Sequence, residues 1–431
     1  MKNVCLLKIK KLLLIISASC LTGIFSALII TFFKLAAEKT IMFSSVAYSY
    51  LRQKPQIFPL FVLLIAIIGY ISSLIITKFK GCRGGGIPTS IAAIKGTLAI
   101  KWLSSITVLP ISALLTFLVG VPLGTEGPCV QMGTAIGNGT HKFFGGSMPE
   151  NSKGHVMSGG AAAGFSIATA SPLSAVIFSF EELNHRFSPA LLLCTGTSIL
   201  SASGTVKLLS MLGISSNKLF DITKIDSLPL KKLFLPLIFG IIIGLFAILF
   251  SRLYGLINQF VHKVLSKISV KIIIPLLFII SSAIGFILPE FLGTGHHLTE
   301  TLLVSRKLWY VLLLILLTRC LILLFSNSAG VTGGIFLPTI VFGAILGALF
   351  AEGAIMFGLI TENYYTLFVV LGIVSFLAAT SHIPLTAFVF SIEALAGINN
   401  IPSIIISILI SYLIIRLLKL EDLTDTVIKT K

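Results

Sequence analysis

The sequence carries little charge for its length. Of its 431 residues only 11% are charged and only 15 are acidic, whereas a soluble domain carries roughly 25% charged residues. No CxxC pair and no HExxH motif occurs in the chain. A hydrolase would need a nucleophile–base pair or a metal motif of that kind. The sequence therefore argues against an enzyme, and it offers no site for a metal or another cofactor.

Two groups of residues resemble redox or metal sites at first glance. His296 and His297 are adjacent, but no third ligand follows at a metal-like spacing, so we expect them in a polar loop between helices. The cysteines stand far apart, which predicts buried, reduced thiols. They are Cys5, Cys20, Cys82, Cys129, Cys194 and Cys320.

Long apolar runs fill the chain instead. Hydrophobic residues make up 56% of it, and the mean hydropathy is +1.05. A membrane-spanning helix needs about 20 mostly apolar residues, which predicts an all-α polytopic membrane protein. The first run continues to Phe33, beyond the length of a signal-peptide core, so we interpret it as a membrane helix. Clear runs are Leu12–Phe33, Pro59–Ile76, Leu233–Phe250, Ile272–Leu288, Leu308–Phe325 and Ile404–Leu418.

The positive charge follows the apolar runs. The net charge is +17, which in a soluble protein would suggest nucleic acid, but no basic patch is interleaved with aromatic residues. The positive-inside rule predicts both termini in the cytoplasm, and we expect a multi-pass protein of the inner (plasma) membrane. The basic clusters are Lys2, Lys8, Lys10 and Lys11; Lys78, Lys80 and Arg83; and Arg416 and Lys419.

One carboxylate stands out within the apolar sequence. Glu126 lies in the stretch Gly124–Gly133, and an ionisable side chain at membrane depth usually faces the protein interior and carries function. Gly127 and Pro128 indicate a helix start, so Glu126 would lie at the positive end of a helix dipole, where anions bind. A carboxylate there is a tethered anion that competes with a mobile one. The alternative interpretation is a simple helix cap.

Two halves of the chain follow one design. The stretch Ala170–Leu183 matches His382–Leu395 in register, and Pro128–Gly133 resembles Pro338–Gly343. We therefore predict a first membrane repeat over residues 1–212 and a second over residues 213–431, ending in a short cytoplasmic tail. In transporters built from repeats, the binding site lies at the repeat interface, where interrupted helices point their N-termini at an anionic substrate.

Three Gly/Pro-rich interruptions agree with that prediction. They are Gly84–Pro88, the Glu126 stretch and Gly333–Pro338. Each joins glycine to a proline that opens a helix. Non-helical backbone at membrane depth must be buried or line a cavity, so we expect these broken helices to meet around the binding site.

These motifs resemble those of the CLC family of chloride channels and chloride–proton antiporters. The sequence reads GGGIP at Gly84–Pro88, GTEGP at Gly124–Pro128 and GIFLP at Gly334–Pro338, in the family's order. The block Pro172–Glu182 also looks like the family. The resemblance implies two inverted-topology repeats with broken helices. The chain stops soon after its last apolar segment, so the prokaryotic type without cytoplasmic CBS domains is expected.

The resemblance also implies roles for single residues and a homodimer with one anion pathway per subunit. Glu126 matches the gating glutamate, which also accepts a proton. Glu182 matches the internal proton-transfer glutamate; the alternative is a surface charge near Arg186. Backbone N–H groups match the anion-binding positions, which are Gly85, Gly86, Ile335 and Phe336.

The sequence departs from the family at three places. Gly85 stands where a serine is usual, Thr125 replaces a basic residue beside the gate, and no tyrosine occurs near Leu423 or Thr424. Losing two hydroxyl ligands predicts a weaker central site and broad anion selectivity.

The leading hypothesis is transport of chloride and similar monovalent anions in exchange for protons. The alternative is a passive gated, voltage-independent anion channel. A fluoride-exporting branch also exists, but GGGIP is closer to the conventional pattern.

Overall fold

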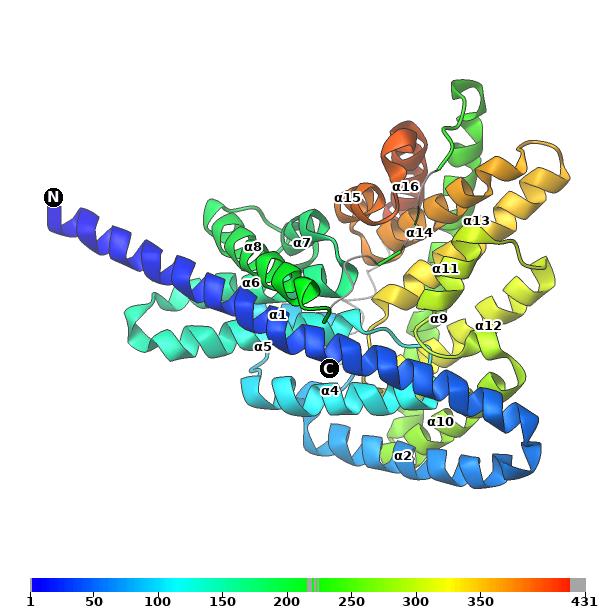
Figure 1. Ribbon diagram of the computed structural model, residues 1–431, viewed down its shortest axis with the longest axis horizontal. Helices are drawn as coiled ribbons and strands as arrows, with labels where there is room; N and C mark the ends of the chain where they lie inside the picture. The colour runs from blue at the N-terminus through cyan, green and yellow to red at the C-terminus, as the bar shows by residue number, and fades with distance from the viewer. Residues whose placement is uncertain (1, 215–218, 221, 223–224, 419–431) are drawn as a thin grey trace.

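The chain folds into helices that differ widely in length. The computed structural model describes residues 2–214, 219–220, 222 and 225–418, and within them no β-strand forms (Figure 1). The helices of the first half are α1 (Lys2–Gln53), α2 (Phe58–Lys78), α3 (Ile87–Ile94), α4 (Trp102–Val119), α5 (Glu126–Phe144), α6 (Lys153–Thr169), α7 (Pro172–Phe178), the π turn η5 (Ser179–Leu183) and α8 (Pro189–Met211). Those of the second half are α9 (Phe234–Leu265), α10 (Val270–Ile287), α11 (His296–Val304), α12 (Trp309–Ala329), α13 (Phe336–Met356), α14 (Tyr365–Ser381), α15 (Pro384–Ala394) and α16 (Ile401–Leu417).

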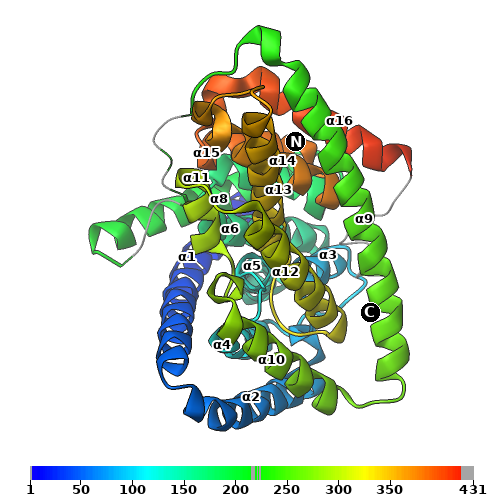
Figure 2. The ribbon, with the colours of Figure 1, turned by 90° about the vertical axis from the view of Figure 1, so that its right-hand side faces the viewer.

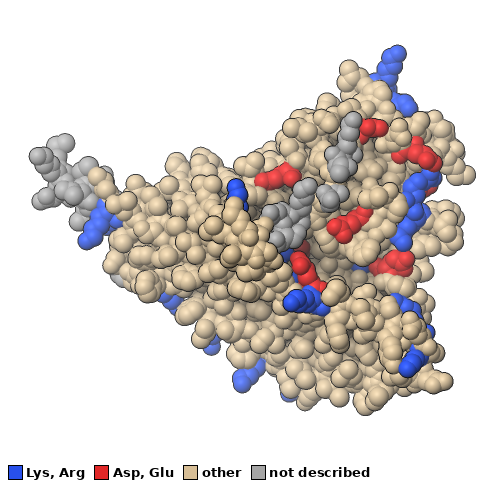
Figure 3. Space-filling model, in the orientation of Figure 1, with Lys and Arg blue, Asp and Glu red and all other residues tan. Residues whose placement is uncertain are grey.

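Ten helices of the described chain are long and apolar enough to cross a membrane. The predicted integral, multi-pass membrane protein is therefore confirmed. The first helix is longer than the apolar run Leu12–Phe33, because α1 continues to Gln53 while packing against α4, α5, α6 and α8. Most of the surface seen in Figure 3 is uncharged, as a surface in contact with lipid requires.

The two halves repeat the same helix packing. Helix α5 packs against α6 in the first half, and α13 packs against α14 in the second. Each pair crosses at glycines: a side chain at Gly133 would overlap the carbonyl of Gly160, and one at Gly343 would overlap the carbonyl of Gly372. In Figure 2 the long helices α1 and α9 stand on opposite sides, with α5 and α13 between them.

The halves run in opposite directions where they meet. Gly124 and Gly334 form an antiparallel bridge in which each N–H donates to the other's carbonyl at 2.7 Å. A reciprocal pair of bonds between equivalent residues requires a twofold relation between the halves. Two further bonds obey it, because Gly84 donates to Gly330 and Gly293 to Gly120, both at 3.1 Å. This is the predicted inverted-topology repeat.

One sequence prediction is wrong in this region. His296 and His297 lie in the first turn of α11 and not in a loop. The reason is that Gly293–Gly295 is the repeat counterpart of Gly84–Gly86. Gly295 takes a positive φ of 90° before α11, as Gly86 takes 73° before α3, a conformation that glycine adopts at no steric cost.

The cysteine prediction is confirmed for part of the set. The five cysteines whose side chains the structure describes are free thiols. Cys82, Cys129 and Cys194 are buried, while Cys20 and Cys320 are half-buried. The predicted division between residues 212 and 213 stays a prediction.

Candidate functional site

Three helix N-termini converge at the crossing of the two repeats. Helix α3 begins directly after Gly86, α5 begins one residue before Gly127, and α13 begins two residues after Gly334. A Cβ at Gly86 would overlap the Gly127 carbonyl, and one at Gly127 would lie 2.9 Å from the Gly334 Cα. Only glycine permits this backbone approach. The predicted anion-binding segments around Gly85 and Ile335 are thus brought to one place.

Glu126 is the carboxylate at this convergence. It is the first residue of α5 and only 2% exposed. Its Oε1 accepts a hydrogen bond from the Thr125 hydroxyl at 3.2 Å, while Oε2 has no hydrogen-bond partner among the described residues. A Cβ added at Gly124 would overlap Glu126 Oε2 and would lie 3.1 Å from the Leu337 side chain, so the carboxylate lies beside the start of α13. The positive ends of two helices therefore act on one acidic side chain.

Ile335 and Phe336 form the start of α13. Ile335 is the N-cap residue, and its carbonyl accepts the first-turn bond from Thr339 at 3.0 Å. The first N–H groups of a helix have no intrahelical partner, so those of α13 can bind an anion. The buried Phe336 ring meets Phe165 at 5.0 Å and Phe390 at 6.3 Å between centroids, which fixes the start of the helix against α6 and α15.

A cavity of about 820 Å³ reaches Glu126. Its wall includes Lys34 and Glu38 of α1 and His296 and His297 of α11. The Lys34 ammonium donates to the carbonyls of Ile167 and Ala168, at 3.0 and 3.1 Å. Sequence reasoning missed Lys34, although a lone cation directly after the apolar run Leu12–Phe33 was the available signal.

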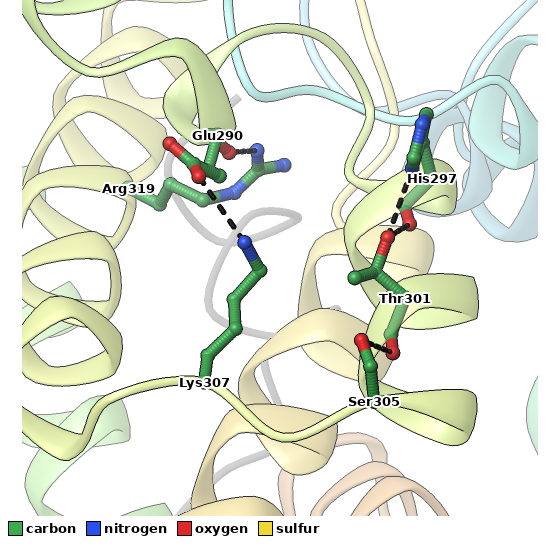
Figure 4. A network of polar contacts seen from close by, with 6 residues as sticks. All are labelled: Glu290, His297, Thr301, Ser305, Lys307 and Arg319. Carbon is green, nitrogen blue, oxygen red and sulfur yellow. Dashed lines mark hydrogen bonds and ion pairs between the residues drawn. The ribbon is translucent and has the colours of Figure 1, made fainter.

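Polar contacts, of which those of Arg319 are buried, hold the cavity wall in place. Figure 4 shows the Glu290–Lys307 ion pair, at 3.2 Å, next to Arg319. The fully buried Arg319 guanidinium donates to the carbonyls of Glu290, Phe291 and Gly293, which lie before α11. His297 bonds Thr301 one turn further on, at 3.1 Å. Within the described ranges no three His, Cys, Asp or Glu side chains are grouped as metal ligands.

Glu182 lies in the π turn η5, apart from the convergence of helix N-termini. Its side chain is buried, so it is not a surface charge. The turn packs against α3 and α6, and α3 begins directly after Gly85 and Gly86, which are predicted to bind the anion. Asn184 closes the turn by donating to the Ser179 carbonyl at 2.8 Å and to the Ser158 hydroxyl at 3.1 Å. The position near Leu423 and Thr424, where the family carries a tyrosine, lies outside the described residues.

Comparison with known proteins identifies relatives over most of the chain. Residues 68–416 match the family model described as voltage gated chloride channel. The H(+)/Cl(-) exchange transporter ClcA of Klebsiella pneumoniae (strain 342) is 26% identical over 378 residues, covering 86% of this chain and 79% of the relative. The protein of that name from Salmonella arizonae is 27% identical over 381 residues, with 86% and 79% covered.

Solved structures show the same fold. A slow cyanobacterial Cl-/H+ antiporter superposes with a TM-score of 0.87 at 22% identity, covering 96% of this chain and 97% of the other. A CLC-type fluoride/proton antiporter superposes with a TM-score of 0.75 at 22% identity, covering 93% and 95%. Because the family match extends over most of the sequence and its signature glycines meet around one buried carboxylate, the chain belongs to the voltage gated chloride channel family.

Proposed function

We propose that this protein transports chloride and similar monovalent anions across the membrane in exchange for protons. The observation that carries the proposal is Glu126, a buried carboxylate at the meeting point of two helix N-termini and in the wall of a cavity. Such N-termini attract any anion. The carboxylate and a mobile anion therefore compete for one place, which couples anion movement to the protonation of Glu126.

Glu126 acts as both gate and proton acceptor in this proposal. As a carboxylate it occupies the anion path, held by the dipoles of α5 and α13. Protonation removes its charge, so the attraction weakens and the side chain swings away. An anion then takes its place. Names of relatives support this function, because the Klebsiella protein is called an H(+)/Cl(-) exchange transporter.

Glu182 delivers protons from the cytoplasmic side. It is buried, while His185 and Arg186, three and four residues further on, are exposed, so water reaches the end of the turn. The Phe178, Phe165 and Phe336 rings pack in series between this turn and the start of α13. That apolar stack excludes bulk water. Glu182 lies on one side of the stack and Glu126 on the other, so the proton route is separate from the anion route.

The assembly that we propose is a homodimer in the inner membrane with both termini cytoplasmic. Glu181 and Glu393 support the dimer, because each is only half-buried and lies where α7 meets α15. Half-buried carboxylates facing lipid would be strongly unfavourable. A second copy of the chain that covers this face would remove the penalty.

Reconstitution into liposomes tests the transport function. Chloride efflux and proton movement are recorded together for wild type, Glu126→Gln and Glu182→Gln. We expect Glu126→Gln to keep anion flux and lose proton coupling, and Glu182→Gln to lose most proton flux while anion flux persists. Proton pumping at the wild-type rate by Glu126→Gln would remove Glu126 from the proton path.

A passive anion channel is the second candidate. The absence of a side chain at Gly85 favours it, because a site with fewer ligands holds its anion less tightly. In the same liposomes a channel would move chloride without any proton movement in the wild type. Fluoride is an alternative transported anion, since a fluoride/proton antiporter shares the fold. Fluoride efflux measured in parallel vesicles distinguishes fluoride transport from chloride transport.

A further inference from the structure

Asn327 is a buried side chain whose amide nitrogen lacks a hydrogen-bond partner. It lies near the end of α12 and is 6% exposed. Its Oδ1 accepts a hydrogen bond from the buried Tyr254 hydroxyl at 2.8 Å. Its Nδ2 makes no hydrogen bond with any described residue. Buried polar groups are nearly always paired, so this donor calls for a partner other than the described residues.

The unpaired amide faces the convergence of helix N-termini. A Cβ at Gly85 would lie 3.4 Å from Asn327 Nδ2 and 3.6 Å from the Gly333 carbonyl. Gly85 precedes α3 and Gly333 precedes α13. The donor therefore points at the place where Gly85 provides no side chain.

We propose that Asn327 Nδ2 is a side-chain ligand of the transported anion and supplies, from α12, the donor that Gly85 lacks. This inference deepens the proposed function and rests on it. An anion that leaves water must replace its lost hydrogen bonds, and an N–H donated to a full negative charge is a strong one. Tyr254 is a positioning residue, because its bond to Oδ1 turns the amide nitrogen toward the anion.

Isothermal titration of the purified protein with chloride tests this role. Asn327→Leu should weaken chloride binding roughly 10- to 100-fold, the value of one charge-assisted hydrogen bond. Asn327→Asp should weaken it further, because a carboxylate repels the anion. The matched control is Asn138→Leu, a buried amide that donates to the Ile100 carbonyl and lies about 18 Å along α5 from Glu126. Its chloride affinity should equal that of the wild type.

A rescue variant separates ligation from packing. In the Asn327→Leu background, Gly85→Ser places a hydroxyl beside the lost amide and should restore most of the affinity. Equal chloride affinity in wild type and Asn327→Leu would overturn the inference, as would a loss that Gly85→Ser does not restore. If Asn327→Leu does not fold, Tyr254→Phe is the substitute, because it frees the Asn327 amide at nearly constant side-chain volume. An unchanged chloride affinity in Tyr254→Phe would then count against the inference. A wild type that binds no chloride would instead overturn the proposed function.

An independent observation concerns the turn that carries Glu182. Glu181 accepts hydrogen bonds from Leu385 N at 3.0 Å and from the backbone and hydroxyl of Thr386, both at 2.7 Å. Its repeat counterpart Glu393 caps α7 in the same way, through Leu173 N and the backbone and hydroxyl of Ser174, at 2.9–3.0 Å. The two repeats therefore cap each other's short helices.

The two caps differ in the residue that comes directly after each glutamate. After Glu181 the chain forms the π turn and buries Glu182, whereas the counterpart of Glu182 is Ala394, which ends a regular α15. Single π turns are rare in proteins, but those that occur are frequently found at functional sites. Consecutive helical side chains point in different directions, so binding Glu181 outward to α15 turns Glu182 inward.

We infer that Glu181 is a positioning residue that holds Glu182 in its buried orientation for proton transfer. The inference rests on the proposed role of Glu182. The chain contains its own control, because Glu181→Gln and Glu393→Gln remove equivalent bonds while only the first lies beside a proton-transfer residue. In liposomes, Glu181→Gln should lower the proton-to-anion ratio toward the Glu182→Gln value, and Glu393→Gln should leave the ratio unchanged.

Each outcome of this comparison is decisive. Equal ratios in wild type and Glu181→Gln would overturn the inference, and so would equal losses in both variants. If Glu182→Gln itself retains normal proton flux, the proposed function fails instead. If the glutamine variants do not fold, smaller changes replace them. Thr386→Val removes the hydroxyl bond to Glu181, and Ser174→Ala removes the equivalent bond to Glu393. A lowered ratio is expected for Thr386→Val alone, and equal ratios would count against the role.

Discussion

Two adjacent glycines in the first signature motif tolerate side chains differently. Gly86 has a φ of 73°, and a Cβ there would overlap the Gly127 carbonyl. At Gly85 the nearest atom to an added Cβ is 3.4 Å away. We therefore expect Gly85→Ser to fold and Gly86→Ala not to accumulate as folded protein.

The serine at position 85 should also tighten anion binding. Its hydroxyl adds a second side-chain donor beside the amide of Asn327, and a charge-assisted hydrogen bond contributes about 1.5–3 kcal/mol, so chloride binding should improve at least tenfold in isothermal titration. Tight chloride binding by the wild type, with no gain from Gly85→Ser, would show that other groups already complete the site.

Lys34 places a positive charge in the cavity, whereas Thr125, where the family usually has a basic residue, is uncharged. It lines the same cavity as Glu126. Attraction of anions into the cavity predicts that Lys34→Met raises the chloride concentration for half-maximal flux. Partly exposed charges are worth up to about 1 kcal/mol, so we expect a change of roughly two- to fivefold.

A matched lysine controls for charge alone. Lys34 and Lys207 both line a smaller neighbouring cavity, but Lys207 does not line the one with Glu126. Lys207→Met should leave half-maximal flux unchanged, and Lys34→Arg should behave as the wild type. The effect of Lys34→Met should shrink at high ionic strength, set with an impermeant salt. An effect that is independent of salt would argue for a packing role.

At the scale of helices, the sequence predicted what glycine, proline and long apolar runs determine. The repeat between Pro128–Gly133 and Pro338–Gly343 predicted two equivalent broken helices, and α5 and α13 start there. It did not predict α11, because Gly293–Gly295 keeps the glycine spacing of Gly84–Gly86 but lacks the apolar and proline residues around it. The π turn at Ser179–Leu183 was also missed, since its sequence matches that of the regular α15.

The glycine crossing of α13 and α14 gives a prediction at this scale. Gly343→Ala forces a methyl group against the Gly372 carbonyl, and such overpacking costs roughly 1–3 kcal/mol. Gly353, on the same helix, has no atom within 4 Å of an added Cβ, so Gly353→Ala should be neutral or slightly stabilising. Thermal unfolding in detergent measures both. Equal melting temperatures for the two variants would contradict close packing at this crossing.

At the scale of the whole molecule, the face formed by α7 and α15 is poorly suited to lipid. Leu173 and Leu385 occupy equivalent places on these helices and are 65% and 63% exposed. The half-buried Glu393 and Glu181 lie beside them. Exposed leucines alone suit lipid, but carboxylates do not. A self-complementary face that contains both repeats is suited to a twofold dimer.

Bulky substitution at that face should separate the subunits without stopping transport. We expect Leu173→Trp/Leu385→Trp to shift the purified protein from dimer to monomer, measured by light scattering in detergent and by subunit counting in liposomes. Leu245→Trp on α9, where the leucine is 58% exposed, is the control and should stay dimeric. Every residue that we assign to the anion or proton path lies within one chain, so the monomer should keep the wild-type proton-to-anion ratio. A monomeric wild type would refute the dimer, and a monomer that lost its coupling would mean that the partner subunit shapes the transport path.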